Sequence, residues 1–329
     1  MTDGDCSGRL RPVEAIEIIS LVDNLLEPSG APSREDVKPL GEWAPDPDNV
    51  RLPRAEHGLS LLVCVQGGFG THTILFDTAF EPGAAMDNAV RMRLDLSPVE
   101  AIVLSHQHWD HTGGLIPILK ALGAKELPVI VHPAGFKERA WKDPAKPDAK
   151  MRMSLPTPKR EEAVAAGARI VEAPGPHLVC DDTILVTGEV PRLTDFEIGM
   201  PFEWVWEDGD WRHDPRVLDD RSIVMHVRGK GLVIVAGCAH SGIVNTVRYA
   251  QKLTGVERVA AIIGGFHLIG EQSERRIAET VAALKPLNPE LLVPSHCTGW
   301  SGRAALAQAF PSAFVPNCIG NMYRIGRRE

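Results

Sequence analysis

The segment between residues 105 and 114 reads SHQHWDHTGG and concentrates side chains that can bind metal ions. Four such side chains occur within six residues, directly after the apolar run 101–104: His106, His108, Asp110 and His111. Neutral imidazoles and carboxylates are ligands that a divalent zinc, iron or manganese ion accepts. Because ionisable groups crowded together need a compensating charge, this segment predicts a metal site.

The spacing within the segment indicates how two ions could share it. If the chain is extended where it leaves the apolar run, His106 and His108 project to the same side and can bind one ion. Asp110 and His111 follow a turn and can then reach a second ion. A single histidine beside an apolar run is usually a core residue with a backbone partner, but four ligand-type residues at this spacing favour metal binding.

Later histidines occupy the same position relative to an apolar run as His106 does. The runs 232–236, 259–263 and 291–293 are followed by Cys238 and His240, by His267, and by His296. The carboxyl ends of strands in open α/β sheets lie at one edge, where binding groups collect. We therefore expect His240 and His296 to complete the coordination. Cys238 could bridge two ions as a thiolate, and His267 could be a ligand, a hydrogen-bond partner of a ligand, or a proton donor.

The other six histidines are interpreted as structural or surface residues, with the first and fourth of them the least certain: His57, His72, His132, His177, His213 and His226. Motifs of other catalytic schemes do not occur. The sequence contains no G-x-S-x-G, H-E-x-x-H or phosphate-binding G-x-x-x-x-G-K-[ST] pattern,.

Short apolar strands alternate with amphipathic helices around these residues. Strands are predicted at 15–22, 59–65, 73–76, 128–132 and the three later runs, and helices at 87–94, 115–121 and 160–166,. Ser241 is the predicted N-cap of a further helix that ends before Gly255. Residues 141–220 hold four of the seven tryptophans, with weak periodicity. We interpret 1–329 as one domain in which 141–220 is an insertion that forms a cap over the site.

Composition excludes several classes of protein. The 329 residues are 44% hydrophobic and carry a formal charge of −8, which disfavours nucleic acid and anionic membranes as partners,. The six cysteines form no C-x-x-C pair, which predicts reduced thiols,. A secretion signal is absent, and no apolar run approaches the roughly 20 residues that span a bilayer,. We expect a cytoplasmic protein that acts on a small molecule, and the sequence leaves its oligomeric state open.

The complete pattern resembles the metallo-β-lactamase superfamily. The similar segments are ILFDT at 74–78, LSHQHWDHTGG at 104–114 and the later single histidines. Four shorter segments resemble the branch named after the synthase of 7,8-dihydropterin-6-methyl-4-(β-D-ribofuranosyl)aminobenzene-5'-phosphate: EHGLS at 56–60, GCAHSGIVN at 237–245, GGFHL at 264–268 and HCTG at 296–299. The resemblance covers about residues 15–325.

This resemblance implies an αββα sandwich with the metals at one edge. It also implies that Asp77 orients the segment 105–114, which we call the metal loop, without being a ligand. One departure concerns the Pro-Gly-His motif of the wider superfamily, which is missing between 180 and 225. His177, in the sequence PGPH, is only an imperfect substitute. The resemblance therefore leaves open which residue is the third ligand of the first metal.

The leading functional hypothesis is a dinuclear metal-dependent hydrolase or related transferase. Two ions, zinc first and iron or manganese as alternatives, would lower the pKa of a water between them, with Asp110 holding that water. His267 would stabilise charge or protonate the leaving group. The substrate would be an ester, a lactone or a phosphate-type small molecule.

Three other functions are considered. A synthase of the branch named above would transfer a pterin and release pyrophosphate. A metal- or ligand-binding protein would lack turnover, although the full ligand set at 106–111 disfavours it. A redox function is known for di-iron members of the superfamily, where a glutamate commonly occupies the position of His108. The histidine at this position disfavours that function.

Overall fold

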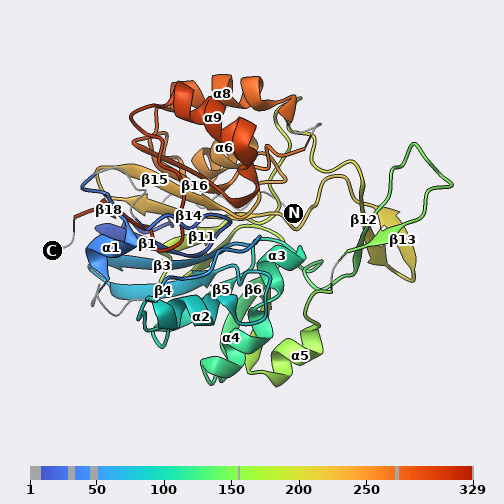
Figure 1. The fold of residues 1–329 in the computed structure, drawn as a ribbon, viewed down its shortest axis with the longest axis horizontal. Helices are drawn as coiled ribbons and strands as arrows, with labels where there is room; N and C mark the ends of the chain where they lie inside the picture. Colours follow the sequence, from blue (N-terminus) through green and yellow to red (C-terminus); the bar gives the residue numbers. More distant parts are fainter. Residues whose placement is uncertain (1–8, 29–33, 45–50, 155, 271–273, 328–329) are drawn as a thin grey trace.

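Two β-sheets pack face to face in the structure, which is a computed structural model (Figure 1). It describes residues 9–28, 34–44, 51–154, 156–270 and 274–327. Helices cover the outer face of each sheet, so the elements stack as helices, sheet, sheet and helices. The αββα sandwich expected from the family resemblance is therefore confirmed.

The first sheet has eight strands among the described residues. Their order is β2 (Val37–Lys38), β18 (Met322–Gly326), β1 (Ala15–Val22), β3 (Ser60–Gly67), β4 (Gly70–Phe76), β5 (Val99–Val103), β6 (Leu127–Val131) and β9 (Ala168–Glu172). β3 runs antiparallel to β1 and β4, whereas β4, β5, β6 and β9 run parallel. The ends of these four parallel strands therefore meet at one edge of the sheet, together with the beginning of β3.

The second sheet has six strands in the described part of the chain. Their order is β10 (His177–Val179), β11 (Ile184–Val186), β14 (Ser222–Val227), β15 (Gly231–Ala236), β16 (Val259–Gly265) and β17 (Leu291–Ser295). β15, β16 and β17 are parallel, and β14 is antiparallel to β15. The segment before β14 therefore lies at the same edge as the segments after β15, β16 and β17.

Both faces of each sheet are buried, which explains the continuous apolar runs in the sequence. In β1, Ile18 points into the core between the sheets, whereas Ile19 points toward the helices. The helices on the first sheet are α2 (Ala84–Arg91), α4 (Leu115–Ala121) and α5 (Arg160–Ala165). Those on the second are α6 (Ile243–Thr254), α8 (Ile277–Leu284) and α9 (Gly299–Ala309). Shorter helices are α1 (Leu40–Trp43), α3 (Trp109–Thr112) and the 3-10 turns Lys285–Leu287 and His296–Thr298.

A third, smaller sheet extends from one side of the sandwich (Figure 1). We call it the cap sheet, and it consists of β13 (Asp210–His213), β12 (Glu203–Glu207), β7 (Arg139–Trp141) and β8 (Arg152–Met153). Residues 141–220, for which an insertion is predicted, thus divide among all three sheets: β9 joins the first and β10 and β11 join the second. That the cap sheet covers a substrate stays a prediction. Within the described ranges, no helix is long and apolar enough to cross a membrane.

The start of α6 differs from the prediction, because Ser241 is not its N-cap. The helix begins after Gly242, and Ser241 Oγ donates to Asp220 Oδ2 at 2.5 Å. The amides of Val244 and Asn245 instead donate to the Glu197 carboxylate, each at 2.8 Å. A carboxylate at this end of a helix satisfies free amides and complements the helix dipole. This partner is distant in sequence, so the local pattern could not identify it.

A buried arginine joins the strand ends of the two sheets. Arg221, directly before β14, donates to Leu104 O at 2.9 and 3.0 Å, to Ile130 O at 2.7 Å and to Ala173 O at 3.1 Å. These carbonyls lie at or just after the ends of β5, β6 and β9 in the first sheet. Burial lowers the pKa of Arg221 to about 10. Arg221 therefore fixes the edge at which the predicted metal residues emerge.

The first prediction concerns this arginine. Arg221→Met should lower the free energy of unfolding by about 3 kcal/mol, because buried carbonyls that lose their donors remain unsatisfied. Urea unfolding measures this loss. The matched control is Arg228→Met, at the other end of β14, where an exposed ion pair with Glu14 should contribute about 1 kcal/mol or less,. Equal losses in the two variants would show that Arg221 does not join the sheets.

Candidate metal centre

Three imidazole nitrogens converge at the edge between the two sheets. His106 Nε2 lies 3.1 Å from His108 Nδ1, and His240 Nε2 lies 3.1 Å from the former and 3.0 Å from the latter. Three imidazoles bound to one ion at usual zinc–nitrogen lengths keep their nitrogens about 3.0–3.4 Å apart. His240, and not His177 in β10, therefore brings the third nitrogen beside His106 and His108. We call these residues the three-histidine group.

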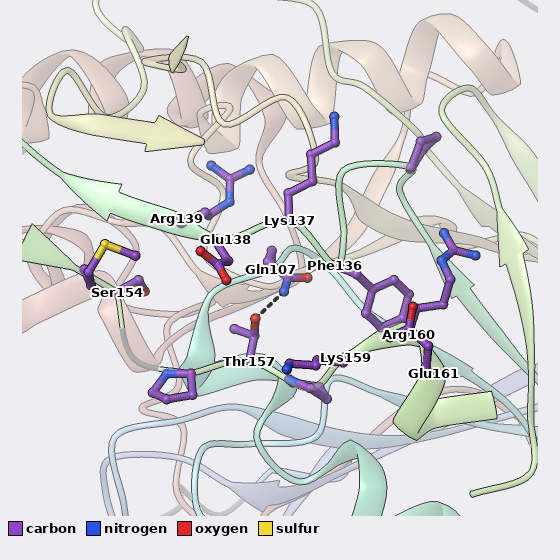
Figure 2. Close-up of a pocket in the computed structure, with 14 residues that line it drawn as sticks. Gln107, Phe136, Lys137, Glu138, Arg139, Ser154, Thr157, Lys159, Arg160 and Glu161 are labelled. Atoms are coloured by element: carbon purple, nitrogen blue, oxygen red, sulfur yellow. Dashed lines mark hydrogen bonds between the residues drawn. The ribbon is translucent and has the colours of Figure 1, made fainter. Parts of the chain in front are cut away.

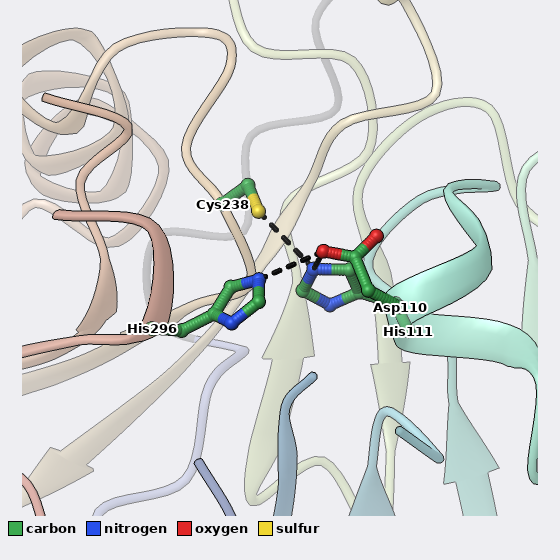
Figure 3. A group of neighbouring side chains, drawn as sticks. All are labelled: Asp110, His111, Cys238 and His296. Carbon is green, nitrogen blue, oxygen red and sulfur yellow. Dashed lines mark hydrogen bonds and ion pairs between the residues drawn. The ribbon is translucent and has the colours of Figure 1, made fainter. Parts of the chain in front are cut away.

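Figure 3 shows a second group of possible ligands, Asp110, His111, Cys238 and His296, which we call the Asp110 group. His296 Nε2 lies 2.9 Å from Asp110 Oδ2, and His111 Nε2 lies 3.6 Å from the same oxygen. Cys238 Sγ completes the group, at 3.1 Å from His111 Nε2. The four donor atoms lie within 4.8 Å of one another. A set of nitrogen, oxygen and sulfur donors of this kind suits a borderline divalent cation.

Cys238, a member of the second group, also lies beside the three-histidine group. Its sulfur also lies within 4.8 Å of the donor nitrogens of His106 and His240. Burial raises the pKa of the Cys238 thiol well above its usual value. A thiolate at this position therefore requires positive charge beside it, and two cations held by the two groups would supply that charge. The described cysteines are free thiols.

A chain of hydrogen bonds from Asp77 fixes the tautomers of two histidines. Asp77 Oδ2 accepts from His111 Nδ1 at 2.6 Å and from Ser105 Oγ at 2.7 Å. Since the Ser105 hydroxyl donates to Asp77, it must accept from His106 Nδ1, which lies 2.8 Å away,. Both rings then present Nε2 lone pairs to the centre. Asp77 contacts His111 and Ser105 and is not one of the grouped donor residues, which agrees with the role that the family resemblance implies for it.

Two further histidines are held by partners that the sequence analysis did not identify. His296 Nδ1 donates to Asn24 Oδ1 at 3.0 Å, and its backbone amide donates to Asp23 Oδ2 at 3.0 Å. His108 is turned the other way, because its Nε2 lies 3.3 Å from Glu203 Oε1. Its Nδ1 lone pair therefore faces the three-histidine group. For His240 Nδ1, the described residues provide no hydrogen-bond partner.

The electrostatics favour the metal-binding protonation states of His106, His240 and Asp110, whereas at His108 and His111 burial is outweighed by acidic neighbours, which raise the pKa values of these two imidazoles. Burial, together with neighbouring histidines, holds the pKa values of His106 and His240 well below their usual range. Burial alone would raise the pKa of Asp110, but His111 and His296 hold it well below its usual value. Neutral imidazoles beside an ionised carboxylate are the forms that coordinate a cation. The chemistry of the donor set therefore fits divalent metal binding,.

His267 lies at the border of the centre. Its ring centroid is 4.3 Å from that of His240, and one of its nitrogens lies within 4.8 Å of the sulfurs of Cys238 and Cys297. The Cys297 thiol donates to Cys238 O at 3.6 Å. This position is compatible with each of the three roles considered for His267, which stay predictions.

His57 lies beside the second group, although it was interpreted as structural or surface. Its Nε2 is 3.6 Å from Asp110 Oδ2, its ring centroid is 4.7 Å from that of His296, and its side chain is 48% exposed. His57 precedes β3, whose beginning shares an edge with the ends of β4 and β5 because β3 is antiparallel. The sequence pattern of histidines that follow apolar strands therefore does not include His57. Asn24 follows β1, so the expectation that binding groups collect after strands could have identified it.

A cavity of about 680 Å³ borders the metal loop at Gln107 (Figure 2). Gln107 lines it, because an extended chain turns this side chain away from His106 and His108,. Gln107 Nε2 donates to Thr157 Oγ1 at 2.5 Å across the cavity wall. The loop thus has one face toward the candidate metal centre and one toward this cavity.

Comparison with known proteins gives consistent results. A family model described as the metallo-β-lactamase superfamily matches residues 54–253. A 7,8-dihydropterin-6-methyl-4-(β-D-ribofuranosyl)-aminobenzene-5'-phosphate synthase of Methanocaldococcus jannaschii is 34% identical over 79% of this chain and 87% of its own length. An uncharacterised protein of the same organism is 30% identical over 82% and 94% of the respective chains. The crystal structure of Tm1679, described as a metal-dependent hydrolase of the β-lactamase superfamily, has a similar fold. It covers 95% of this chain and 100% of its own, with a TM-score of 0.71 and 21% identity.

The second prediction concerns Gly237, next to Cys238. A Cβ atom there would lie 2.1 Å from Ser105 Oγ, so Gly237→Ala should displace this hydroxyl and release His106 Nδ1. We expect metal affinity to fall about 10-fold or more, as when other partners of ligating histidines are lost. Competition with a chromogenic chelator measures this affinity.

Gly68→Ala is the matched control, because a Cβ atom at Gly68 meets nothing within 4 Å. Ser105→Ala removes the same hydroxyl without crowding and covers the case in which Gly237→Ala fails to fold. Unchanged affinity in a folded Ser105→Ala variant would contradict the role assigned to Ser105.

Proposed function

The chain belongs to the metallo-β-lactamase superfamily, and we propose that it is an enzyme that uses two divalent cations to attack a small-molecule substrate. The observation that carries the proposal is the contact between the three-histidine group and the Asp110 group through one shared sulfur, Cys238 Sγ. Zinc is the first candidate, because nitrogen, sulfur and carboxylate donors suit it, and iron or manganese are alternatives.

The donor residues would divide between the two cations as follows. His106, His108 and His240 would hold one cation, and Asp110, His111 and His296 the other, with Cys238 between them. Two cations in these positions would lower the pKa of a water molecule and polarise a substrate oxygen. All seven donor residues are buried, so the centre would be largely shielded from bulk solvent. We infer hydrolysis of an ester, a lactone or a phosphate-type compound.

His57 is a candidate for contact with the substrate, since it is half-exposed. Its Nδ1 lies 3.2 Å from Asn24 Nδ2, and Asn24 Oδ1 already accepts a hydrogen bond from His296. Because the Asn24 amide nitrogen donates, His57 Nδ1 accepts and its proton must reside on Nε2. The Nε2–H group lies on the side of Asp110, where it could donate to a bound oxygen. His267 could protonate a leaving group.

The second candidate function is transfer of a pterin with release of pyrophosphate. It is favoured by the 34% identity to the Methanocaldococcus jannaschii synthase, which extends over most of both chains. Members of one superfamily share a site and differ in substrate, so the same residues serve either reaction. A binding protein without turnover is the remaining alternative.

One experiment separates these functions. Protein purified without added metal is first analysed for its elements, and then tested on esters, lactones and phosphodiesters and, in parallel, for pyrophosphate release from a dihydropterin diphosphate and a ribosyl-aminobenzene phosphate. Hydrolysis supports the first function and pyrophosphate release the second. Metal-loaded protein that turns over none of them supports the binding protein.

The third prediction is that His106→Ala and Asp110→Ala each lower turnover at least about 1,000-fold while the protein stays folded. The reason is that each variant removes one donor of a different group, and metal sites depend on ligand number. Activity, metal content and circular dichroism are measured together. His226→Ala, in β14, is the matched control and should keep its activity. Full activity in a metal-analysed His106→Ala variant would contradict the assignment.

The fourth prediction concerns metal removal. Dialysis against a chelator should abolish activity and lower the melting temperature, because unpaired buried donors remain and ligand binding no longer stabilises the folded state. Adding two equivalents of zinc should restore both. If the chelated, metal-free protein keeps its activity, the catalytic role of the cations is wrong.

A further inference from the structure

His108 is held differently from the other histidines of the centre. Asp77, Ser105 and Asn24 orient His111, His106 and His296. All three partners follow a strand of the first sheet within two residues. His108 instead meets Glu203, the first residue of β12 in the cap sheet, at 3.3 Å. One histidine of the three-histidine group is thus oriented from outside the sandwich.

Glu203 is fixed in place by an ion cluster around Arg139 of β7. Arg139 Nη1 lies 3.3 Å from Glu203 Oε1 and 3.1 Å from Asp214 Oδ2, and Nη2 contacts Asp219 Oδ1. Glu203 and Asp219 are fully buried and Arg139 is 4% exposed. Desolvation disfavours the charge on Arg139, but Asp219 and Glu203 outweigh it and raise the pKa of the guanidinium. A buried cluster of this kind requires close contact, since any separation leaves charges unpaired.

The same cluster also holds the backbone of the metal loop. Asp219 Oδ2 accepts from the amide of Gln107 at 2.7 Å, between His106 and His108. Arg139 and Gln107 also line the cavity that borders the loop (Figure 2). The ion cluster therefore contacts the metal loop twice: Glu203 of the cap sheet meets the His108 ring, and Asp219, between β13 and β14, holds the Gln107 amide.

We propose that Glu203 is a positioning residue of the metal centre and that the cap sheet and the three-histidine group depend on each other. By accepting from His108 Nε2, Glu203 holds the ring in the tautomer whose Nδ1 lone pair faces His106 and His240. This inference rests on the metal binding proposed above and extends it to a residue of the cap sheet.

The dependence must act in both directions. A carboxylate hydrogen-bonded to a ligating imidazole raises its basicity and fixes its orientation, which strengthens metal binding. A cation on Nδ1 in turn makes the Nε2–H group a stronger donor to Glu203. Because coupling between two equilibria is reciprocal, the factor by which the docked cap sheet tightens metal binding is also the factor by which metal stabilises docking.

The fifth prediction is measured as zinc affinity by chelator competition and as the visible spectrum of the cobalt-substituted protein. Glu203→Ala should weaken binding of one of the two ions about 10- to 100-fold and change the cobalt spectrum. Glu203→Gln retains an oxygen that accepts from His108 and should recover most of this affinity. Neither measurement uses enzymatic activity.

Two control variants distinguish loss of the His108 contact from disturbance of β12 or of the Arg139 cluster. Glu207→Gln changes the other end of β12, where Glu207 pairs with Lys137 on the surface, and should leave affinity and spectrum unchanged. Asp214→Asn removes a different carboxylate from Arg139 without touching His108, and should change affinity less than about 3-fold. A loss in Asp214→Asn as large as in Glu203→Ala would overturn the proposal, because the cluster and not the His108 contact would be responsible.

The unmodified protein provides an independent test, which also covers a Glu203→Ala variant that fails to fold. Zinc should slow amide hydrogen exchange in β7 and β12 by about the factor that Glu203 adds to metal affinity. Unchanged exchange in these strands, or a folded Glu203→Ala variant with normal affinity and spectrum, would overturn the inference while leaving the proposed function intact. A wild-type protein that binds no divalent metal would overturn both.

Discussion

The candidate centre depends on one constraint: hydrogen-bond acceptors behind the buried imidazoles of His106, His108, His111 and His296 turn the lone pair of each ring inward. Asp77 meets this constraint for two rings, directly for His111 and through Ser105 for His106. A carboxylate can do so because it only accepts hydrogen bonds, which leaves a single possible direction for each proton. The strand end that carries Asp77, the small Gly237 beside Ser105 and the extended metal loop are all arranged around this carboxylate.

Much of this centre could be predicted from the sequence, because its residues follow a simple rule. Apolar strands that end in histidines identified His106, His108, His240 and His296, and the parallel arrangement of strands then brings their ends to one edge. The fold followed from the family resemblance, which the two facing sheets bear out.

What the sequence could not reveal has physical reasons as well. His57 comes before a strand and reaches the edge only because that strand is antiparallel to its neighbours. Glu203 and Glu197 act across long separations, on His108 and on the start of α6, and no local pattern marks a carboxylate whose partner is distant. The prediction that Ser241 is the helix cap was wrong for this reason, because the residues around a helix start do not reveal a buried glutamate from another segment.

The division of the candidate ligands between the two sheets has a consequence for how the protein matures. His106, His108, Asp110 and His111 come from the first half of the chain, whereas Cys238, His240 and His296 come from the second. A nascent polypeptide on the ribosome cannot assemble either complete ligand set before its second half has emerged and docked. Loading of the proposed cations would therefore be a late event in biogenesis, after both sheets have come together.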